Sequence, residues 1–102
     1  MPPLPEGLIV VAKRDCPTCQ LIEPLLADIE REAGPLTVYS QDDPTFAEGV
    51  AGAQHDATLE HSFSLKTEFV PTLIRVKDGQ EVERTYGWHR EDWQKLTGMA
   101  GL

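Results

Sequence analysis

The chain has 102 residues, of which 40% are hydrophobic and 25% are charged, a composition that suits a single globular domain over residues 1–102. Its 17 acidic and 9 basic residues give a formal net charge of −8, which would repel nucleic acid and anionic membranes. No apolar run approaches the roughly 20 residues that a membrane span needs. Neither nucleic acid nor a membrane is therefore expected as a partner.

The first residues, Met-Pro-Pro-Leu-Pro-Glu, have neither the basic start nor the long apolar stretch of a secretory signal. If the native protein begins here, the expected compartment is the cytoplasm. The alternative is a domain cut from a longer chain.

The first elements form a strand, a helix and a second strand. Residues 8–12 are a continuous apolar run that predicts a buried strand, and Cys16 and Pro17 begin a helix, where proline suits the first position. Gly34-Pro35 ends that helix, and residues 36–39 form the next strand. The helix buries one stripe of apolar residues, namely Ile22, Leu25, Leu26, Ile29 and Ala33. A strand–helix–strand unit predicts a parallel, right-handed pair.

Residues 43–57 form the least regular part of the chain. A connection of this length usually folds into a short element or carries function. Phe46, Ala47 and Val50 give it a modest apolar stripe. We therefore expect a short helix or turn over residues 43–49, packed on the edge of the sheet by Phe46.

The second half begins with a helix over residues 59–66. Thr58 is the expected cap, and Leu59, Ser62 and Phe63 are expected to face inward.

A hairpin and a last helix follow. Residues 72–77 and 81–86 are antiparallel strands joined at Asp78-Gly79, a strong turn signal. A final helix over residues 90–97 buries Trp93 and Leu96. The expected order is β-α-β-α-β-β-α, an α/β fold with a four-stranded mixed sheet and helices on both faces.

The two cysteines, Cys16 and Cys19, are too few for a disulfide scaffold and cannot complete a four-cysteine zinc site. No metal is expected, because His55 and His61 also lack ligand spacing. A Cys-x-x-Cys pair between a strand and a helix indicates redox chemistry. The helix N-terminus would stabilise the Cys16 thiolate as the nucleophile, and Cys19, one turn later, would resolve the mixed disulfide.

The chain resembles the thioredoxin-fold superfamily over almost its whole length. The residues that carry the resemblance are Cys16-Pro17-Thr18-Cys19 after a buried strand, Val70-Pro71-Thr72 at the start of the third strand, Asp78-Gly79 in the hairpin, and Gly87. The resemblance implies a minimal thioredoxin-like fold with a cis peptide bond before Pro71. It also implies that Pro71 faces the cysteines and that the Val70 backbone, with Gly87 nearby, binds substrate.

Several positions depart from thioredoxins. Asp15 stands where they have tryptophan, Val10 where they have a buried acid, and Ser40 where they have its partner lysine. The Cys-Pro-x-Cys motif after Lys13 is similar to glutaredoxins, but Gly87-Trp88 and the later Asp92 match their glutathione signature poorly.

Residues 43–57 are expected to be an insertion outside the catalytic core of that pattern. Their ends lie near the dithiol end of the sheet, so the insertion either helps to choose partners, with its acids favouring a basic one, or is a passive surface loop.

The expected function is thiol–disulfide exchange by a monomer on a protein or small-molecule disulfide, with a reductase or glutathione as electron donor and no cofactor. Reductases, oxidases and isomerases share this motif. Lys13, Arg14, Pro17 and Thr18 are candidate modulators of the thiolate. The alternatives are a glutathione-dependent, glutaredoxin-like reductase and a non-enzymatic redox-sensing or binding module. An accessible Cys16 would favour an exchange catalyst, and a buried one a module.

Overall fold

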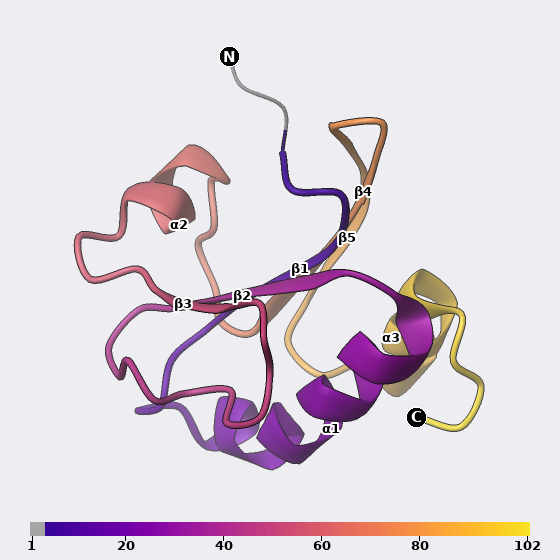
Figure 1. Cartoon of the computed structure of the whole chain (residues 1–102), viewed down its shortest axis with the longest axis horizontal. Coiled ribbons are helices and arrows are strands. Elements are labelled where there is room, and N and C mark those ends of the chain that lie inside the picture. The colour runs from indigo at the N-terminus through magenta and orange to yellow at the C-terminus, as the bar shows by residue number, and fades with distance from the viewer. Residues whose placement is uncertain (1–3) are drawn as a thin grey trace.

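The computed structural model describes residues 4–102. Five strands form one mixed sheet in the order β3-β2-β1-β4-β5. Figure 1 shows α1 and α3 on one side of this sheet and α2 on the other. The elements in chain order are β1 (Gly7–Ala12), α1 (Pro17–Ala33), β2 (Leu36–Ser40), β3 (Ala53–His55), α2 (Glu60–Ser64), β4 (Thr72–Lys77), β5 (Gln80–Tyr86) and α3 (Arg90–Thr97). The expected α/β fold with helices on both faces is confirmed. The expected single domain also included residues 1–3, which lie outside the described residues.

The strand β1 is the centre of the fold and is buried on both faces. It pairs in parallel with β2 and antiparallel with β4, which confirms the expected strand–helix–strand unit. Alternate residues of β1 enter two separate apolar clusters, as expected for a strand covered on both sides. Val10 joins the cluster beneath α1 and α3, and Ile9 joins the cluster beneath α2.

The strand count of four was wrong, because β3 adds a fifth strand. Only three residues long, β3 pairs in parallel with β2 at the sheet edge. Its sequence, Ala-Gln-His, lacks the β-branched apolar residues that indicate a strand. The preceding Gly52 allows the pairing: a Cβ atom at this position would lie 1.9 Å from the carbonyl oxygen of Leu36.

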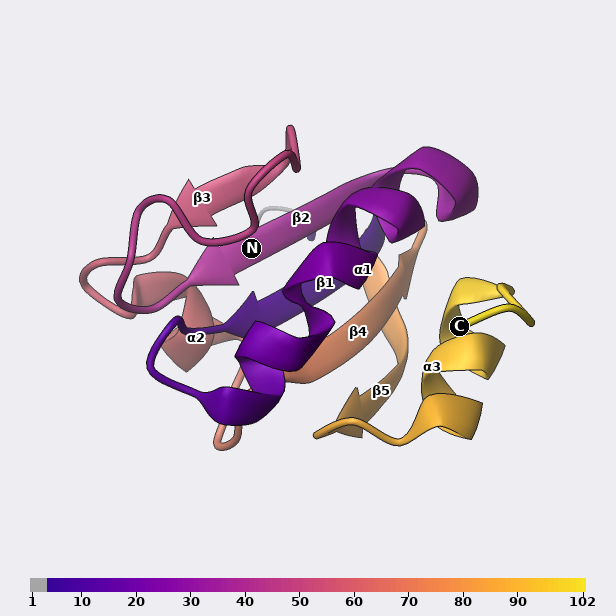
Figure 2. The ribbon, with the colours of Figure 1, turned by 90° about the horizontal axis from the view of Figure 1, so that it is seen from below.

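The segment before β3 contains turns, which is one of the two forms expected for residues 43–49, and no helix. Phe46, Ala47 and Val50 are nevertheless buried in the cluster beneath α1 and α3, not set on the sheet edge alone. The carboxylate of Glu30 on α1 accepts hydrogen bonds from the N–H groups of Ala51 and Gly52. Figure 2 shows this segment running beside α1. It is therefore part of the folded core rather than an appended loop.

The helix α2 is shorter than expected and turned differently. Thr58 does not cap it; the carboxylate of Asp56 instead accepts hydrogen bonds from the N–H groups of His61 and Ser62 and from the Ser62 hydroxyl. Ser62 faces inward as expected, but Leu59 and Phe63 are exposed. The inward position of Ser62 beside Asp56 places Phe63 on the outer side.

The C-terminal elements match the expectation. Strand β4 and helix α3 have the predicted bounds, and Trp93 and Leu96 are buried. Trp93 Nε1 donates to the carbonyl oxygen of Gly87 at 2.8 Å, which ties α3 to the turn after β5. Across residues 4–102, none of the helices is long and apolar enough to cross a membrane.

Asp56 makes the stability of the fold depend on pH in the acid range. Burial alone would raise the pKa of Asp56, but the hydrogen bonds from Ser62 and His61 outweigh it and lower the pKa below the ordinary value. A lowered pKa means that the carboxylate stabilises the fold above about pH 4 and that this contribution is lost as pH falls further. We expect Asp56→Asn to cost about 1–3 kcal/mol at neutral pH and less at low pH.

Urea unfolding of the wild type and Asp56→Asn from neutral pH down to pH 3 measures this. The difference in unfolding free energy should shrink as the pH falls below about 4, because the wild-type carboxylate becomes protonated. A difference that stays constant over this range would contradict the assignment of Asp56 as the ionised cap.

Candidate active site

The dithiol lies where β1 gives way to α1. Cys16 is the N-cap of α1, with an extended backbone, and Pro17 follows as the first helical residue. The Cys19 N–H donates to Cys16 Sγ at 3.2 Å, so the first sulfur caps the helix that carries the second. Cys16 retains 8% of its surface and Cys19 retains 0%. Cys16 is thus mostly buried, but it is the more exposed of the two cysteines.

The Cys19 thiol is fully buried and has a raised pKa. Burial, followed by the hydrogen bond with Cys16, raises the pKa of the Cys19 thiol to about 12, although the Lys13 backbone N–H and charge act in the opposite direction. Cys19 therefore stays protonated at neutral pH. A partly exposed Cys16 and a fully buried, protonated Cys19 suit an attacking Cys16 and a resolving Cys19.

The segment before β4 lies against the dithiol. The peptide bond between Val70 and Pro71 is cis, and the Val70 carbonyl oxygen lies 3.9 Å from Cys16 Sγ. The N–H of Gly87 donates to the Pro71 carbonyl oxygen at 2.7 Å. Of the three positions named from the sequence, Val70 therefore lies beside Cys16, and Pro71, the next residue, is joined to Gly87 by a backbone hydrogen bond.

The candidate modulators are arranged unequally. The Arg14 guanidinium forms hydrogen bonds with both Glu23 carboxylate oxygens and with Asp43, so its charge is directed into an ion-pair network. Lys13 acts on Cys19 as described above. Pro17 is exposed and Thr18 is half-buried in the first turn of α1.

An acidic clamp, formed by Asp42, Asp43 and Glu23, holds the loop before Cys16. Asp42 accepts hydrogen bonds from the backbone N–H groups of Arg14 at 2.7 Å and Asp15 at 2.9 Å. Glu23 also accepts from the N–H of Ala47, so the segment before β3 is joined to the dithiol loop. The two partners of each bond are far apart in the chain. The adjacent acids at 42 and 43 were the only signal of this clamp in the sequence.

Glu23 and Asp42 are ionised anchors of the clamp. Burial would raise the pKa of Glu23, but Arg14 and the N–H groups of Glu48 and Ala47 lower it further than burial raises it. In the same way, N–H groups led by that of Asp15 lower the pKa of Asp42. Both carboxylates therefore remain charged at neutral pH.

The positions that depart from thioredoxins take structural roles. Val10 is wholly buried in β1, and the Ser40 hydroxyl donates to the Asp43 carbonyl oxygen at 2.7 Å. Next to Gly87, Trp88 is half-buried and packs against α3, with its ring centroid 5.2 Å from that of Trp93.

His55 and His61 have different partners in the fold. The His61 ring stacks on Tyr39 with centroids 4.3 Å apart, while His55 Nε2 lies 3.0 Å from the Asp42 carbonyl oxygen. Among residues 4–102, no three His, Cys, Asp or Glu side chains converge as a metal site.

This sheet order, with a dithiol at the start of α1 facing a cis-proline segment, defines a protein of the thioredoxin fold. Solved structures with this fold include mitochondrial thioredoxin 3 of Saccharomyces cerevisiae, with a TM-score of 0.64, 15% identity, and coverage of 89% of this chain and 74% of that one. Fasciola hepatica thioredoxin gives a TM-score of 0.63 and 21% identity, covering 91% of this chain and 81% of that one. No protein-family model matches the sequence. The expected thioredoxin-like fold is confirmed.

Proposed function

We propose that this protein is a thiol–disulfide oxidoreductase that uses Cys16 and Cys19. The observation that carries the proposal is the position of Cys16, which caps α1 with its sulfur and is the more exposed of the two cysteines. A helix N-terminus favours a thiolate, which is the form that attacks a disulfide.

The reaction proceeds in two exchanges. Cys16 thiolate attacks one sulfur of the substrate disulfide, forms a mixed disulfide and releases the other substrate sulfur as a thiolate. Cys19 then loses its proton and attacks Cys16 Sγ, which breaks the mixed disulfide and releases the second substrate thiol. Two electrons pass to the substrate, and a Cys16–Cys19 disulfide remains. The raised pKa of Cys19 supports its role as the second, slower nucleophile.

Val70, Pro71 and Gly87 form the proposed docking edge for the substrate. The Val70 carbonyl oxygen lies 3.9 Å from Cys16 Sγ, and the hydrogen bond from the Gly87 N–H to the Pro71 carbonyl oxygen holds the edge in place. A substrate strand that pairs with the Val70 backbone would bring its disulfide to Cys16.

The substrate is a protein or small-molecule disulfide, and the electron donor is a reductase or glutathione. The protein acts as a monomer without a resident cofactor, and the proposed compartment is the cytoplasm, where a dithiol stays reduced. A glutathione-dependent reaction is less well supported, because Asp92 accepts a hydrogen bond from the Thr85 hydroxyl and Trp88 packs toward Trp93.

The small exposed fraction of Cys16 favours a second candidate, a non-enzymatic redox-sensing or binding module. An exchange catalyst needs an accessible thiol, and Cys16 is largely covered. In such a module the dithiol would be vestigial or would sense the redox state of its surroundings, and it would not turn over a substrate disulfide.

Reduction of insulin by dithiothreitol separates these two candidates. We expect catalytic amounts of the protein to shorten the time to insulin precipitation, because Cys16 would carry electrons from dithiothreitol to the insulin disulfides. The control is dithiothreitol alone. A time course identical to the control would overturn the enzymatic proposal and support the module.

A further inference from the structure

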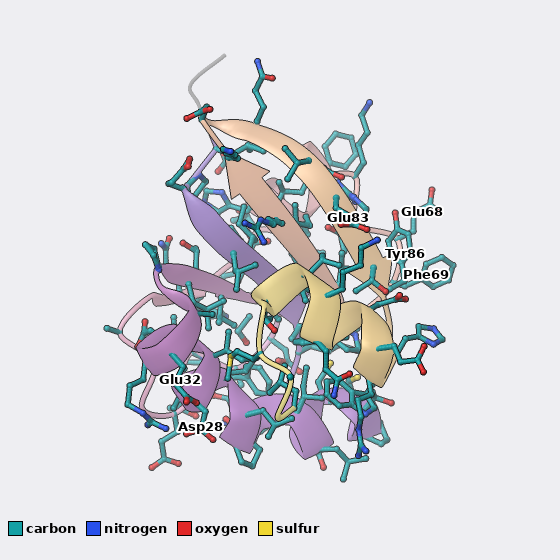
Figure 3. The ribbon with its side chains drawn as sticks, turned by 90° about the vertical axis from the view of Figure 1, so that its right-hand side faces the viewer. Asp28, Glu32, Glu68, Phe69, Glu83 and Tyr86 are labelled. Atoms are coloured by element: carbon teal, nitrogen blue, oxygen red, sulfur yellow. The ribbon has the colours of Figure 1, made fainter. Side chains whose placement is uncertain are left out.

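Two exposed aromatic side chains lie together next to the proposed docking edge. Phe69 is 61% exposed and Tyr86 is 40% exposed, and their rings meet edge to face with centroids 5.7 Å apart. Figure 3 shows both rings at the margin of the sheet, pointing away from the core. Exposed aromatic pairs that remain ordered offer a large apolar contact surface at a low cost in conformational entropy.

Both aromatic residues are held to the cis-proline segment. Phe69 directly precedes Val70, and its carbonyl oxygen accepts a hydrogen bond from the Thr72 hydroxyl at 2.6 Å. Tyr86 is the register partner of Thr72 and directly precedes Gly87. The pair therefore has a set position relative to Cys16, and a chain bound along Val70 would extend over it.

The charged side chains around the pair are mainly acidic. Glu68 is exposed and precedes Phe69, and Glu83 of β5 pairs with Lys95 at 3.4 Å; Figure 3 shows both carboxylates on the same side of the molecule as the rings. Arg84 is a cation at the pair: its guanidinium lies 5.9 Å from the Tyr86 ring centroid, and its Nη1 donates a hydrogen bond to the Tyr86 hydroxyl at 3.4 Å. Arg84 is bound to Glu81 and to the Leu65 carbonyl oxygen. An anionic ligand is therefore poorly matched to this surface.

We propose that Phe69 and Tyr86 select the substrate: a polypeptide disulfide whose reacting cysteine is followed or preceded by a large apolar residue. The apolar side chain packs on the two rings while the cysteine sulfur meets Cys16, and Glu68 favours a basic residue next to it. Glutathione disulfide has no such side chain and carries a negative charge on each half. This inference rests on the proposed exchange activity and names its substrate class.

Two synthetic peptide disulfides test the proposal, one with leucine and one with serine beside the cysteine, together with glutathione disulfide. For the wild type, kcat/KM should be about tenfold higher for the leucine peptide than for the serine peptide. The double variant Phe69→Ser, Tyr86→Ser should lose this preference, because only the leucine peptide uses the rings. Its kcat/KM for glutathione disulfide should stay at the wild-type value.

Two matched control variants substitute exposed apolar residues that lie outside the proposed docking surface. Val82→Ser alters a 56% exposed residue of the same strand, and Phe63→Ser alters an 87% exposed phenylalanine of α2. Both should keep the tenfold preference. Circular dichroism of each variant shows that it is folded before its rates are compared.

The possible outcomes distinguish the role of the aromatic pair from the proposed exchange activity. A wild type that exchanges with none of the three disulfides would overturn the proposed function itself. A wild type that reduces the leucine and serine peptides equally, or glutathione disulfide fastest, would overturn only the role of the aromatic pair. A loss of preference in the Phe63 variant would also count against that role, since it would point to a general effect of surface apolarity.

Discussion

Cys16→Ser is expected to lower the rate of disulfide exchange by at least about 1000-fold, because the substitution removes the attacking sulfur. Cys19→Ser is expected to retain the first exchange and to stop at the mixed disulfide, since no second thiol resolves it. Mass spectrometry of each variant after incubation with a disulfide peptide measures the adduct. A stable adduct on the Cys16 variant and none on the Cys19 variant would reverse the two roles.

Alkylation provides an independent readout of the same difference. The Cys19 thiol is fully buried and its pKa is raised to about 12, so iodoacetamide at neutral pH should label Cys16 and leave Cys19 unmodified in the folded protein. Unfolding in guanidinium chloride should make both thiols reactive. Equal labelling of the two cysteines in the folded wild type would contradict the assignment.

Phe46→Ala is expected to destabilise the fold by about 3–5 kcal/mol, a large fraction of the roughly 5–15 kcal/mol that stabilises a small domain. Phe46 is 1% exposed and packs in the cluster beneath α1 and α3, and the Arg14 guanidinium lies 5.2 Å from its ring centroid. Truncation would leave a cavity under the segment that holds the dithiol loop. Urea unfolding followed by circular dichroism measures the change.

The chain offers a matched control in Phe63, which is 87% exposed on α2. Phe63→Ala should change the unfolding free energy by less than about 0.5 kcal/mol, because the ring is already in solvent. If Phe46→Ala changed the unfolding free energy as little as Phe63→Ala, residues 43–57 would contribute nothing to the core. The interpretation of this segment as a passive surface loop would then hold.

Most elements could be predicted because their signals are local. The apolar run that became β1, the proline at the start of α1 and the Asp78-Gly79 turn each act on a few neighbouring residues. Trp93 could be assigned to the core from the helical spacing of α3 alone. Local propensity and periodicity suffice where an element is formed by residues adjacent in the chain.

The short elements could not be predicted in the same way. The strand β3 has only three residues, and its pairing with β2 depends on Gly52 approaching Leu36. The helix α2 has five residues, and Asp56 rather than Thr58 caps it, which turns Phe63 outward. For such short segments, contacts with other elements outweigh intrinsic preference.

The thioredoxin-like fold class and the place of Cys16 and Cys19 at a strand-to-helix junction could be predicted, because both depend on spacing along the chain. The surroundings of that pair could not, because they depend on contacts between distant parts of the chain. Asp42 holds the Arg14 backbone from 28 residues away, and the Val70 carbonyl oxygen meets Cys16 Sγ from 54 residues away. Such partners are brought together by the packing of the sheet and α1. The free energy of that packing comes from residues throughout the core and not from any short stretch of the chain.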